Sequence, residues 1–389
     1  MKININYILF VVVILVAAIA VVSSQETFTD DEESLLTSKD VRKRNLIREN
    51  IKPTVILKNA NMYYKDTSRK SFKSNTLAYI TPWNSKGYQI AETFKHKFTH
   101  LSPVWYQIKY EKSSFLIEGD HNVDKGWVDR VRDGSKTKVL PRFAFEGNAW
   151  NTNTFETTLK NQKFINSLIE TLKKHNFDGL VLEGIIYMTN RDVRNKFLET
   201  LAEKLHALNK ELIIVITPIS QDKSRPPLFN EIDFAMLSKT VDGFSLMTYD
   251  YAPSQGANAP KQWVEDNIKI YLSYYRSDES NPEAISQKLF VGIPFYGYKV
   301  SMSKNQQQPS PVVGHEYLKL LKSNKDQKII WNDMTQEHSL AYFDKGVQTV
   351  VTYPSLLFID QRIQLAKEYK VSISIWEIGQ GLDYFYDLL

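Results

Sequence analysis

The side chains best suited to chemistry in this sequence are acids and aromatic rings at the ends of short apolar runs. Carboxylates bind sugar hydroxyls by paired hydrogen bonds, and the flat faces of Trp and Tyr stack on pyranose rings. No histidine stands at these positions, which disfavours a metal centre and a serine–histidine triad. The pattern therefore indicates a saccharide site, with the alternative that the same rings close a protein core. The positions concerned are Trp83, Trp105, Tyr106, Glu146, Glu183, Tyr249, Asp250, Tyr251, Tyr296, Trp376 and Glu377.

One stretch, residues 177–185, carries the acid on which the functional interpretation depends. It reads Phe-Asp-Gly-Leu-Val-Leu-Glu-Gly-Ile, which predicts a buried strand with Glu183 near its ligand-facing end. Because side chains alternate along a strand, Val181, Glu183 and Ile185 are expected to share one face. The alternative for Glu183 is a buried structural acid that is hydrogen-bonded to Tyr249 or to the backbone.

A scaffold must bring these scattered positions together, and the chain shows eight strand-like apolar runs separated by helical periodicity. This alternation is typical of an α/β protein with a (β/α)8 TIM barrel, in which sites lie at the carboxyl ends of the strands. The runs are residues 77–83, 98–110, 138–145, 178–184, 212–219, 242–251, 288–298 and 371–379.

An open, doubly wound sheet is the competing fold. The sequence has no G-x-G-x-x-G after the first run and no phosphate loop, so the usual nucleotide site of such a sheet is missing. The long gap between the seventh and eighth runs, about residues 299–353, predicts a small insertion. Within it we expect a helix near 316–321 and strands near 328–331 and 349–353.

Composition excludes several classes of function. The 389 residues include 49 basic and 44 acidic ones, and the net charge of +5 is spread without long blocks, so we expect no nucleic-acid partner. The absence of cysteine removes disulfides, thiolate metal sites and cysteine nucleophiles. We expect neither a metal nor another cofactor.

The N-terminal segment predicts the compartment. A basic start, an apolar run and small residues over 1–24 are typical of a secretory signal peptide, with an uncleaved signal anchor as the alternative. The protein is then secreted or lumenal, in the endomembrane system or lysosome, and it contacts a membrane only if the signal is retained. Residues 25–74 are polar and charged, which predicts an extended arm before the main domain.

Three segments resemble marker segments of glycoside hydrolase family 18, the chitinases and chitinase-like lectins. They are Phe177-Asp178-Gly179, Met247-Thr248-Tyr249-Asp250, and Trp376 near the last predicted strand end. The resemblance covers residues 75–389. It implies the barrel fold, and it implies that Tyr249 faces an N-acetyl group, with Asp250 beside it and Trp376 as the floor for a sugar ring.

The resemblance also implies that this sequence departs from the active members of the family at their catalytic positions. Active members carry D-G-x-D-x-D-x-E on the fourth strand, and the final Glu protonates the glycosidic oxygen while the substrate's own N-acetyl oxygen attacks. Here Val181 stands at the second Asp, Glu183 at the third and Ile185 at the catalytic Glu. An aliphatic side chain donates no proton, so we expect no enzymatic activity by this route.

We therefore predict a lectin for oligosaccharides that contain N-acetylglucosamine. Two alternatives stay open: a glycosidase acting through Glu183 or Glu146, and a scaffold that binds a receptor protein. The expected saccharide-binding residues are Glu183, Tyr249, Asp250, Trp376, Trp83, Tyr106, Glu146 and Tyr296.

Overall fold

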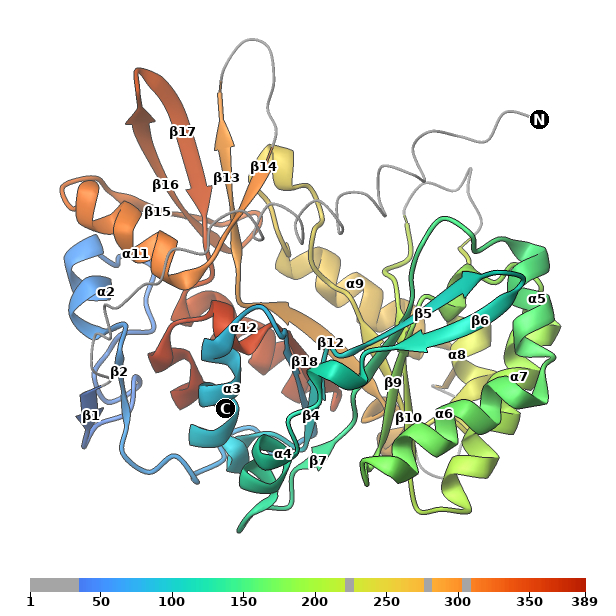
Figure 1. Cartoon of the computed structure of the whole chain (residues 1–389). Helices are drawn as coiled ribbons and strands as arrows, with labels where there is room; N and C mark the ends of the chain where they lie inside the picture. The colour runs from blue at the N-terminus through green and yellow to red at the C-terminus, as the bar shows by residue number, and fades with distance from the viewer. Residues whose placement is uncertain (1–34, 221–226, 276–281, 303–308) are drawn as a thin grey trace.

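The computed structural model describes residues 35–220, 227–275, 282–302 and 309–389, and its centre is a curled sheet of parallel strands (Figure 1). Every run predicted to be a strand contains one. The parallel strands are β3 (Thr76–Ile80), β4 (His100–Pro103), β7 (Lys138–Val139), β8 (Arg142–Phe145), β9 (Gly179–Glu183), β10 (Glu211–Ile216), β11 (Gly243–Leu246), β12 (Leu289–Pro294) and β18 (Ser372–Trp376). An antiparallel hairpin, β5 (Tyr106–Glu111) and β6 (Ser114–Glu118), extends the sheet beside β8.

The parallel strands follow one another in the order β8-β9-β10-β11-β12-β18-β3-β4-β7. Strands β7 and β8 are two segments of one predicted run, separated by Leu140 and Pro141. Backbone hydrogen bonds continue across this break on both sides, from Leu140 N to Leu101 O (2.9 Å) and from Val181 N to Pro141 O (3.0 Å). This α/β arrangement is consistent with a TIM barrel.

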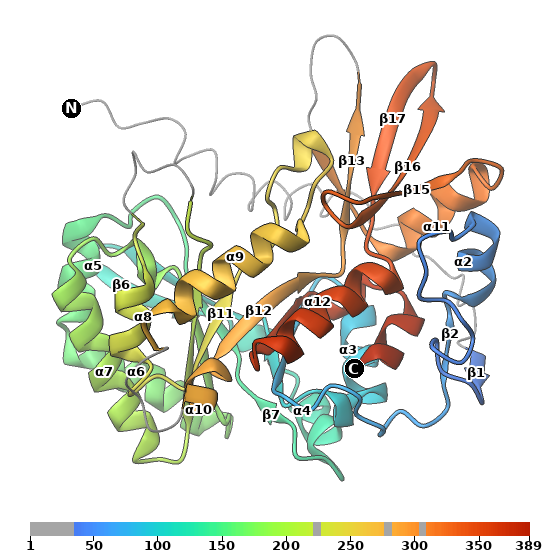
Figure 2. The same ribbon diagram turned by 180° about the vertical axis from the view of Figure 1, so that it is seen from behind.

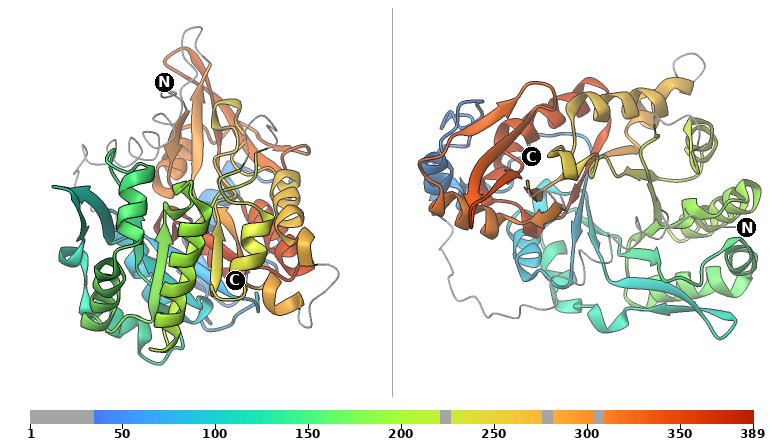
Figure 3. Two further views of the ribbon diagram at one scale, coloured as in Figure 1. Left: turned by 90° about the vertical axis from the view of Figure 1, so that its right-hand side faces the viewer. Right: turned by 90° about the horizontal axis from the view of Figure 1, so that it is seen from above.

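Helices cover the outside of the sheet (Figures 1 and 2). Those beside β8 to β11 form one flank, while α12 packs on β12 and β18. The view from above in Figure 3 shows the same helices arranged around the strands. The outer helices are α3 (Ser85–Thr93), α4 (Lys125–Arg132), α5 (Thr152–Leu159), α6 (Gln162–Lys174), α7 (Arg191–His206), α8 (Glu231–Leu237), α9 (Lys261–Leu272), α10 (Pro282–Ser286) and α12 (Leu356–Glu368).

Two separate hydrophobic clusters show that both faces of the sheet are covered. Alternate side chains of β10 divide between them, because Leu212 and Ile214 belong to the large cluster under the helices and Ile213 and Val215 to a small inner one. Alternation of this kind follows from the two-residue period of a strand. The inner cluster comprises Leu77, Tyr79, Val104, Leu140, Val181, Ile213, Val215 and Phe290, with Met247 and Trp376 packed against it.

The predicted insertion is a second, antiparallel sheet beyond the carboxyl ends of the parallel strands (Figure 1). Its strand order is β14-β13-β17-β16-β15, and helix α11 (Gly314–Ser323) lies between β14 and β15 in the chain. The first strand, β13, begins three residues after β12 ends, so the insertion is tied directly to the parallel sheet. Its strands are β13 (Gly297–Ser301), β14 (Pro309–Val312), β15 (Ile329–Asn332), β16 (Glu337–Asp344) and β17 (Val347–Thr352).

The described part of the N-terminal arm packs against the C-terminal segment. It forms β1 (Leu35–Thr37), α2 (Pro53–Asn59) and β2 (Met62–Tyr64). Its anchor is Asp387, whose carboxylate accepts hydrogen bonds from Val41 N (3.1 Å), Tyr64 N (2.8 Å) and the Arg44 guanidinium (3.2 Å).

The predicted signal segment, 1–24, lies outside the described residues. Among the helices of the described ranges, none combines the length and the apolar character that a membrane crossing needs.

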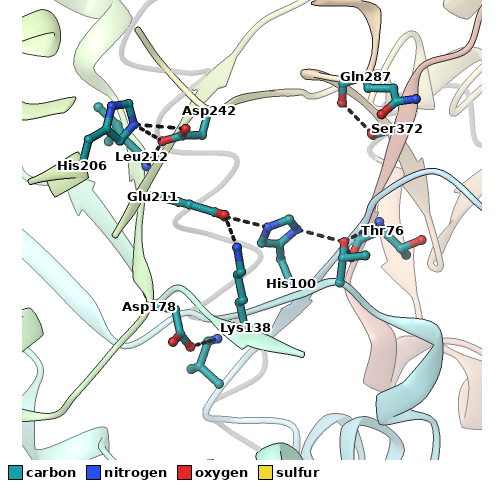
Figure 4. A network of polar contacts seen from close by, with 12 residues as sticks. Thr76, His100, Lys138, Asp178, His206, Glu211, Leu212, Asp242, Gln287 and Ser372 are labelled. Carbon is teal, nitrogen blue, oxygen red and sulfur yellow. Dashed lines mark hydrogen bonds and ion pairs between the residues drawn. The ribbon is translucent and has the colours of Figure 1, made fainter. Parts of the chain in front are cut away.

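A polar network joins the starts of the parallel strands, at the end of the sheet opposite the insertion (Figure 4). The carboxylate of Glu211, at the start of β10, pairs with Lys138 of β7 and accepts a hydrogen bond from His100 Nε2 of β4 at 2.9 Å. Burial alone would raise the pKa of Glu211, but these two partners outweigh it and hold the pKa at about 2.

Glu211→Gln tests what this network contributes to stability. The folded pKa of about 2 lies below the ordinary value of 4.5, so the carboxylate stabilises the fold above about pH 4.5, and that contribution is lost as the pH falls toward 2. We expect the variant to be less stable by about 3 kcal/mol at pH 7, and the difference from the parent to shrink below pH 4.5. Urea unfolding across this pH range measures the difference; a gap that stays constant from pH 7 to pH 3 contradicts the assignment.

Candidate functional site

The acid at the end of β9, Glu183, is held by an arginine on the neighbouring strand. Arg142 and Val181 lie opposite each other in the β8–β9 ladder, and Glu183 lies one inward position further along β9, opposite Ala144. The guanidinium of Arg142 donates from Nε to Glu183 Oε2 at 2.6 Å and from Nη2 to Oε1 at 2.8 Å. Both carboxylate oxygens of Glu183 are therefore engaged in a two-pronged ion pair, the strongest geometry for this pair of groups.

Arg142 also organises a second acid. Its Nη1 lies 3.5 Å from Glu146 Oε1, and its side chain is only 7% exposed, against 39% for Glu146. Burial lowers the pKa of Arg142, but the Glu183 and Glu146 carboxylates outweigh burial and raise it. Burial also raises the pKa of the Glu146 carboxyl; Arg142 opposes that rise and Glu183 adds to it.

The chain turns sharply after Glu183, and the predicted alternation stops there. Gly184 has φ = 86°, and a Cβ at this position would lie 3.0 Å from the Phe145 Cβ, so glycine is required for both backbone and space. The next residues form a short 3-10 helix, Ile185–Tyr187. Ile185 is fully buried in the large cluster under the helices, not in the inner one. The prediction that it shares a face with Val181 and Glu183 was wrong, because the strand ends at Glu183.

The aromatic residues Trp376 and Tyr249 lie beside the charged group. Trp376, the last residue of β18, is partly exposed, with its ring 6.0 Å from Arg142 Cζ and 5.2 Å from the Tyr79 ring. A Cβ on Gly292 would lie 2.8 Å from Tyr249 Cε1, so this glycine lets the Tyr249 ring lie against β12. Burial, with further contributions from Tyr79 and Glu183, raises the pKa of Tyr249 well above its ordinary value, so its hydroxyl stays protonated.

Asp250 connects this group to the insertion sheet. Its Oδ1 accepts hydrogen bonds from Tyr296 (2.5 Å) and Tyr298 (2.7 Å), and its backbone N donates to Asn258 Oδ1 at 2.9 Å. Burial raises the pKa of the Asp250 carboxyl, and the two tyrosine hydroxyls partly offset that rise. The Tyr249 and Tyr296 rings are 6.3 Å apart, which places Asp250 and Tyr296 next to Tyr249.

The structure thus brings six of the eight predicted residues together with Arg142. We call the following set the mouth cluster: Arg142, Glu146, Glu183, Tyr249, Asp250, Tyr296 and Trp376.

Trp83 and Tyr106 are not joined to the mouth cluster by the contacts of the described residues. Trp83 is 48% exposed on the loop after β3. Its neighbour Asn84 donates a 2.5 Å hydrogen bond to Glu377, the residue that follows Trp376 of the mouth cluster. Tyr106 is a correction: it is 1% exposed, stacks on Phe143 at 4.3 Å and donates to Asp120. The predicted run 98–110 breaks after β4, and Tyr106 consequently points into the core beneath the helices.

Sequence reasoning missed Arg142, which the structure places at the centre of the cluster. The signal was present, because an arginine inside the run Arg-Phe-Ala-Phe must be paired if the strand is buried. It also missed Tyr298, whose partner Asp250 lies 48 positions away. Among the residues that the structure describes, no group of three or more His, Cys, Asp or Glu is arranged to hold a metal ion.

Comparison with known proteins gives a consistent family assignment. The model of the family described as glycosyl hydrolases family 18 matches residues 75–381. A curated relative, an uncharacterized glycosylase of Bacillus subtilis, is 22% identical over 231 residues, 58% of this chain and 64% of that protein. The match therefore spans less than two thirds of that relative's own length.

Solved structures show the same fold. The chitinase of Chromobacterium violaceum superimposes with a TM-score of 0.67 at 16% identity, over 81% of this chain and 98% of that one. A family 18 chitinase mutant from Cycas revoluta, solved in complex with (GlcNAc)4, gives a TM-score of 0.63 at 16% identity, with the same two shares of 81% and 98%.

Removing Arg142 should be more harmful than removing the whole ion pair. Arg142→Met leaves the Glu183 carboxylate partly buried without its partner, and we expect the free energy of unfolding to fall by about 3–5 kcal/mol. The double variant Arg142→Met/Glu183→Leu should recover a large part of this loss, because no unpaired charge remains. Denaturant unfolding of both variants and of Glu183→Leu completes the cycle; additive losses contradict the pairing.

Ile185→Glu tests the turn at Gly184. The side chain at 185 lies in the helix-covered core, so a carboxylate there should destabilise the fold by more than about 3 kcal/mol and should not reach the mouth cluster. Ile185→Val is the matched control, with an expected loss of about 1 kcal/mol. A stable Ile185→Glu variant that gains chitinase turnover would show that residue 185 faces the carboxyl ends of the strands after all.

Proposed function

Because the chain belongs to glycosyl hydrolase family 18, we propose that it is a non-catalytic chitinase-like lectin whose (β/α)8 barrel mouth binds chitin oligomers or related glycans that contain N-acetylglucosamine. The observation that carries the non-catalytic part is the Arg142–Glu183 ion pair. Arg142 donates to both oxygens of Glu183, so neither oxygen is available to a leaving group unless that pair is broken. The position that the family motif assigns to the catalytic acid is the buried Ile185, which lies beyond the end of β9.

The binding part of the proposal rests on the aromatic half of the mouth cluster. Trp376 keeps a partly exposed ring for stacking, and Tyr249 keeps a protonated hydroxyl that donates to a sugar or N-acetyl oxygen. Asp250 is positioned beside it by Tyr296 and Tyr298. The (GlcNAc)4 complex of the Cycas chitinase supports the choice of ligand class.

A glycosidase acting through Glu146 is the second candidate, and one observation favours it. Burial raises the pKa of Glu146, and its side chain is 39% exposed, so a proton on this carboxyl is accessible from solvent. The same role for Glu183 would require breaking its pair with Arg142.

A finer resemblance, in the C-terminal run, supports one more proposal. The C-terminal run 375–389 is similar to that of chitinase domain-containing protein 1, also called stabilin-1-interacting chitinase-like protein, which keeps a receptor-binding scaffold as an alternative function. We also propose a secreted or lumenal location, on the basis of residues 1–24 alone.

Calorimetry with (GlcNAc)4 tests the lectin. We expect measurable binding by the parent protein and about tenfold weaker binding by Trp376→Ala, equivalent to about 1.4 kcal/mol of lost stacking. Trp83→Ala, which removes an indole outside the mouth cluster, should have a smaller effect. If the parent gives no heat with any chito-oligomer and neither variant changes a glycan-array profile, the saccharide function fails and the receptor scaffold becomes the leading hypothesis.

Turnover of chromogenic chitobiosides and chitotriosides separates lectin from enzyme. The lectin predicts none at any pH. Hydrolysis that is abolished by Glu146→Gln but kept by Glu183→Gln, with both variants shown to be folded by thermal unfolding, would establish the alternative, with Glu146 as the acid.

A further inference from the structure

A cavity of about 310 Å³ opens among the starts of the parallel strands, at the end of the sheet opposite the mouth cluster. Its walls come from the beginnings of β3, β4, β7, β10, β11 and β12, so six strands converge on it. Figure 4 shows Glu211 beside His100 and Lys138, and Asp242 beside His206, at the starts of neighbouring strands. The lining residues are Asn75, Thr99, His100, Lys136, Lys138, Glu211, Ile213, Asp242 and Phe290.

The charges of the lining balance. Two lysines, Lys136 and Lys138, face two acids, Glu211 and Asp242. The acids are oriented by protein partners: Glu211 by Lys138 and His100, and Asp242 by His206 and by the backbone N of Leu212 (2.8 Å). A bound anion would be repelled by the two carboxylates, and a bound cation would be repelled by the two ammonium groups. The lining therefore favours a ligand without net charge.

Hydrogen-bonding capacity remains after these contacts. A carboxylate has about four lone-pair sites, so Glu211 and Asp242 each retain acceptor capacity. On the donor side, the Asn75 amide and the Lys136 ammonium have no side-chain partner within the described part of the chain. The open cavity therefore presents acceptors and donors together.

The remaining wall is apolar. The Phe290 ring, fixed edge-to-face against His100 at 5.8 Å, lies beside Ile213 in the inner cluster. A polyhydroxylated ring matches this combination, because its hydroxyls both donate and accept while its C–H face packs on an apolar surface. The cavity volume lies at the lower end of the range of small-molecule sites.

From this geometry we infer that the strand-start cavity is a second ligand site, which takes a neutral polyol of monosaccharide size. The inference does not depend on the proposed lectin function. The inner apolar cluster lies between this cavity and the mouth cluster, so a ligand in one does not contact the other.

The test uses the full chain and two sugars that lack the N-acetyl group proposed to be recognised by the mouth cluster, glucose and mannose, and binding is measured by saturation-transfer NMR and calorimetry. We expect weak, saturable binding of at least one probe. Asn75→Trp, which places an indole over the cavity, should abolish it, and the matched Asn75→Ser should keep it. Asp242→Asn should weaken it about tenfold, as expected for one lost hydrogen bond to a charged group. Trp376→Ala, at the opposite end, should leave it unchanged.

Thermal unfolding of each variant confirms that the fold is kept, and Asp242→Asn keeps the test decisive if Asn75→Trp does not fold. Binding that survives Asn75→Trp, or that disappears with Trp376→Ala, places the sugar elsewhere and overturns the proposal. Binding of inorganic phosphate or of an amino acid in place of both sugars would overturn the ligand class. So would the failure of both sugars to bind.

Discussion

A buried guanidinium must be neutralised where it lies, and in this protein that requirement fixes the chemistry of the carboxyl end of the sheet. Arg142, as a whole residue, is 5% exposed, and it points inward at the level of Val181. Its charge therefore has to be neutralised by acids that lie further toward the carboxyl ends of the strands. Glu183 supplies both of its oxygens, and Glu146 lies at the edge of the same guanidinium. Both acids of the mouth cluster that flank Arg142 are thereby tied to a structural task.

A second consequence concerns the aromatic residues around the ion pair. The Trp376 ring lies 6.0 Å from Arg142 Cζ. Burial raises the pKa of Tyr249, and the neighbouring Tyr79 and Glu183 add to that rise. Both rings therefore lie beside the same charged pair, and on the other side Asp250 accepts a hydrogen bond from Tyr298 of the insertion sheet. Preorganised rings lose little freedom when a ligand binds, which suits binding without chemistry.

The sequence predicts the framework of this fold well, because each strand is a local apolar run and each outer helix has its own periodicity. What it predicts poorly depends on neighbours distant in the chain. Glycine is needed at 184, where the chain turns after Glu183, because a Cβ there would lie 3.0 Å from the Phe145 Cβ, and Tyr106 is rotated into the core because the run 98–110 breaks after β4. The role of Arg142 likewise needs the register of β8 against β9, which no local pattern contains.

The two ends of the sheet can carry separate tasks because an apolar layer lies between them. The Tyr79 hydroxyl donates a hydrogen bond to Ser245 Oγ at 2.8 Å, so this polar group is satisfied inside the inner cluster. Around it pack the apolar side chains of Val181, Ile213 and Phe290. Charges above and below this layer are each neutralised locally, by Arg142 at one end and by Lys138 with His100 at the other. Since neither network reaches through the layer, a substitution in one end should act on stability through that end alone, and binding at the two ends should be additive.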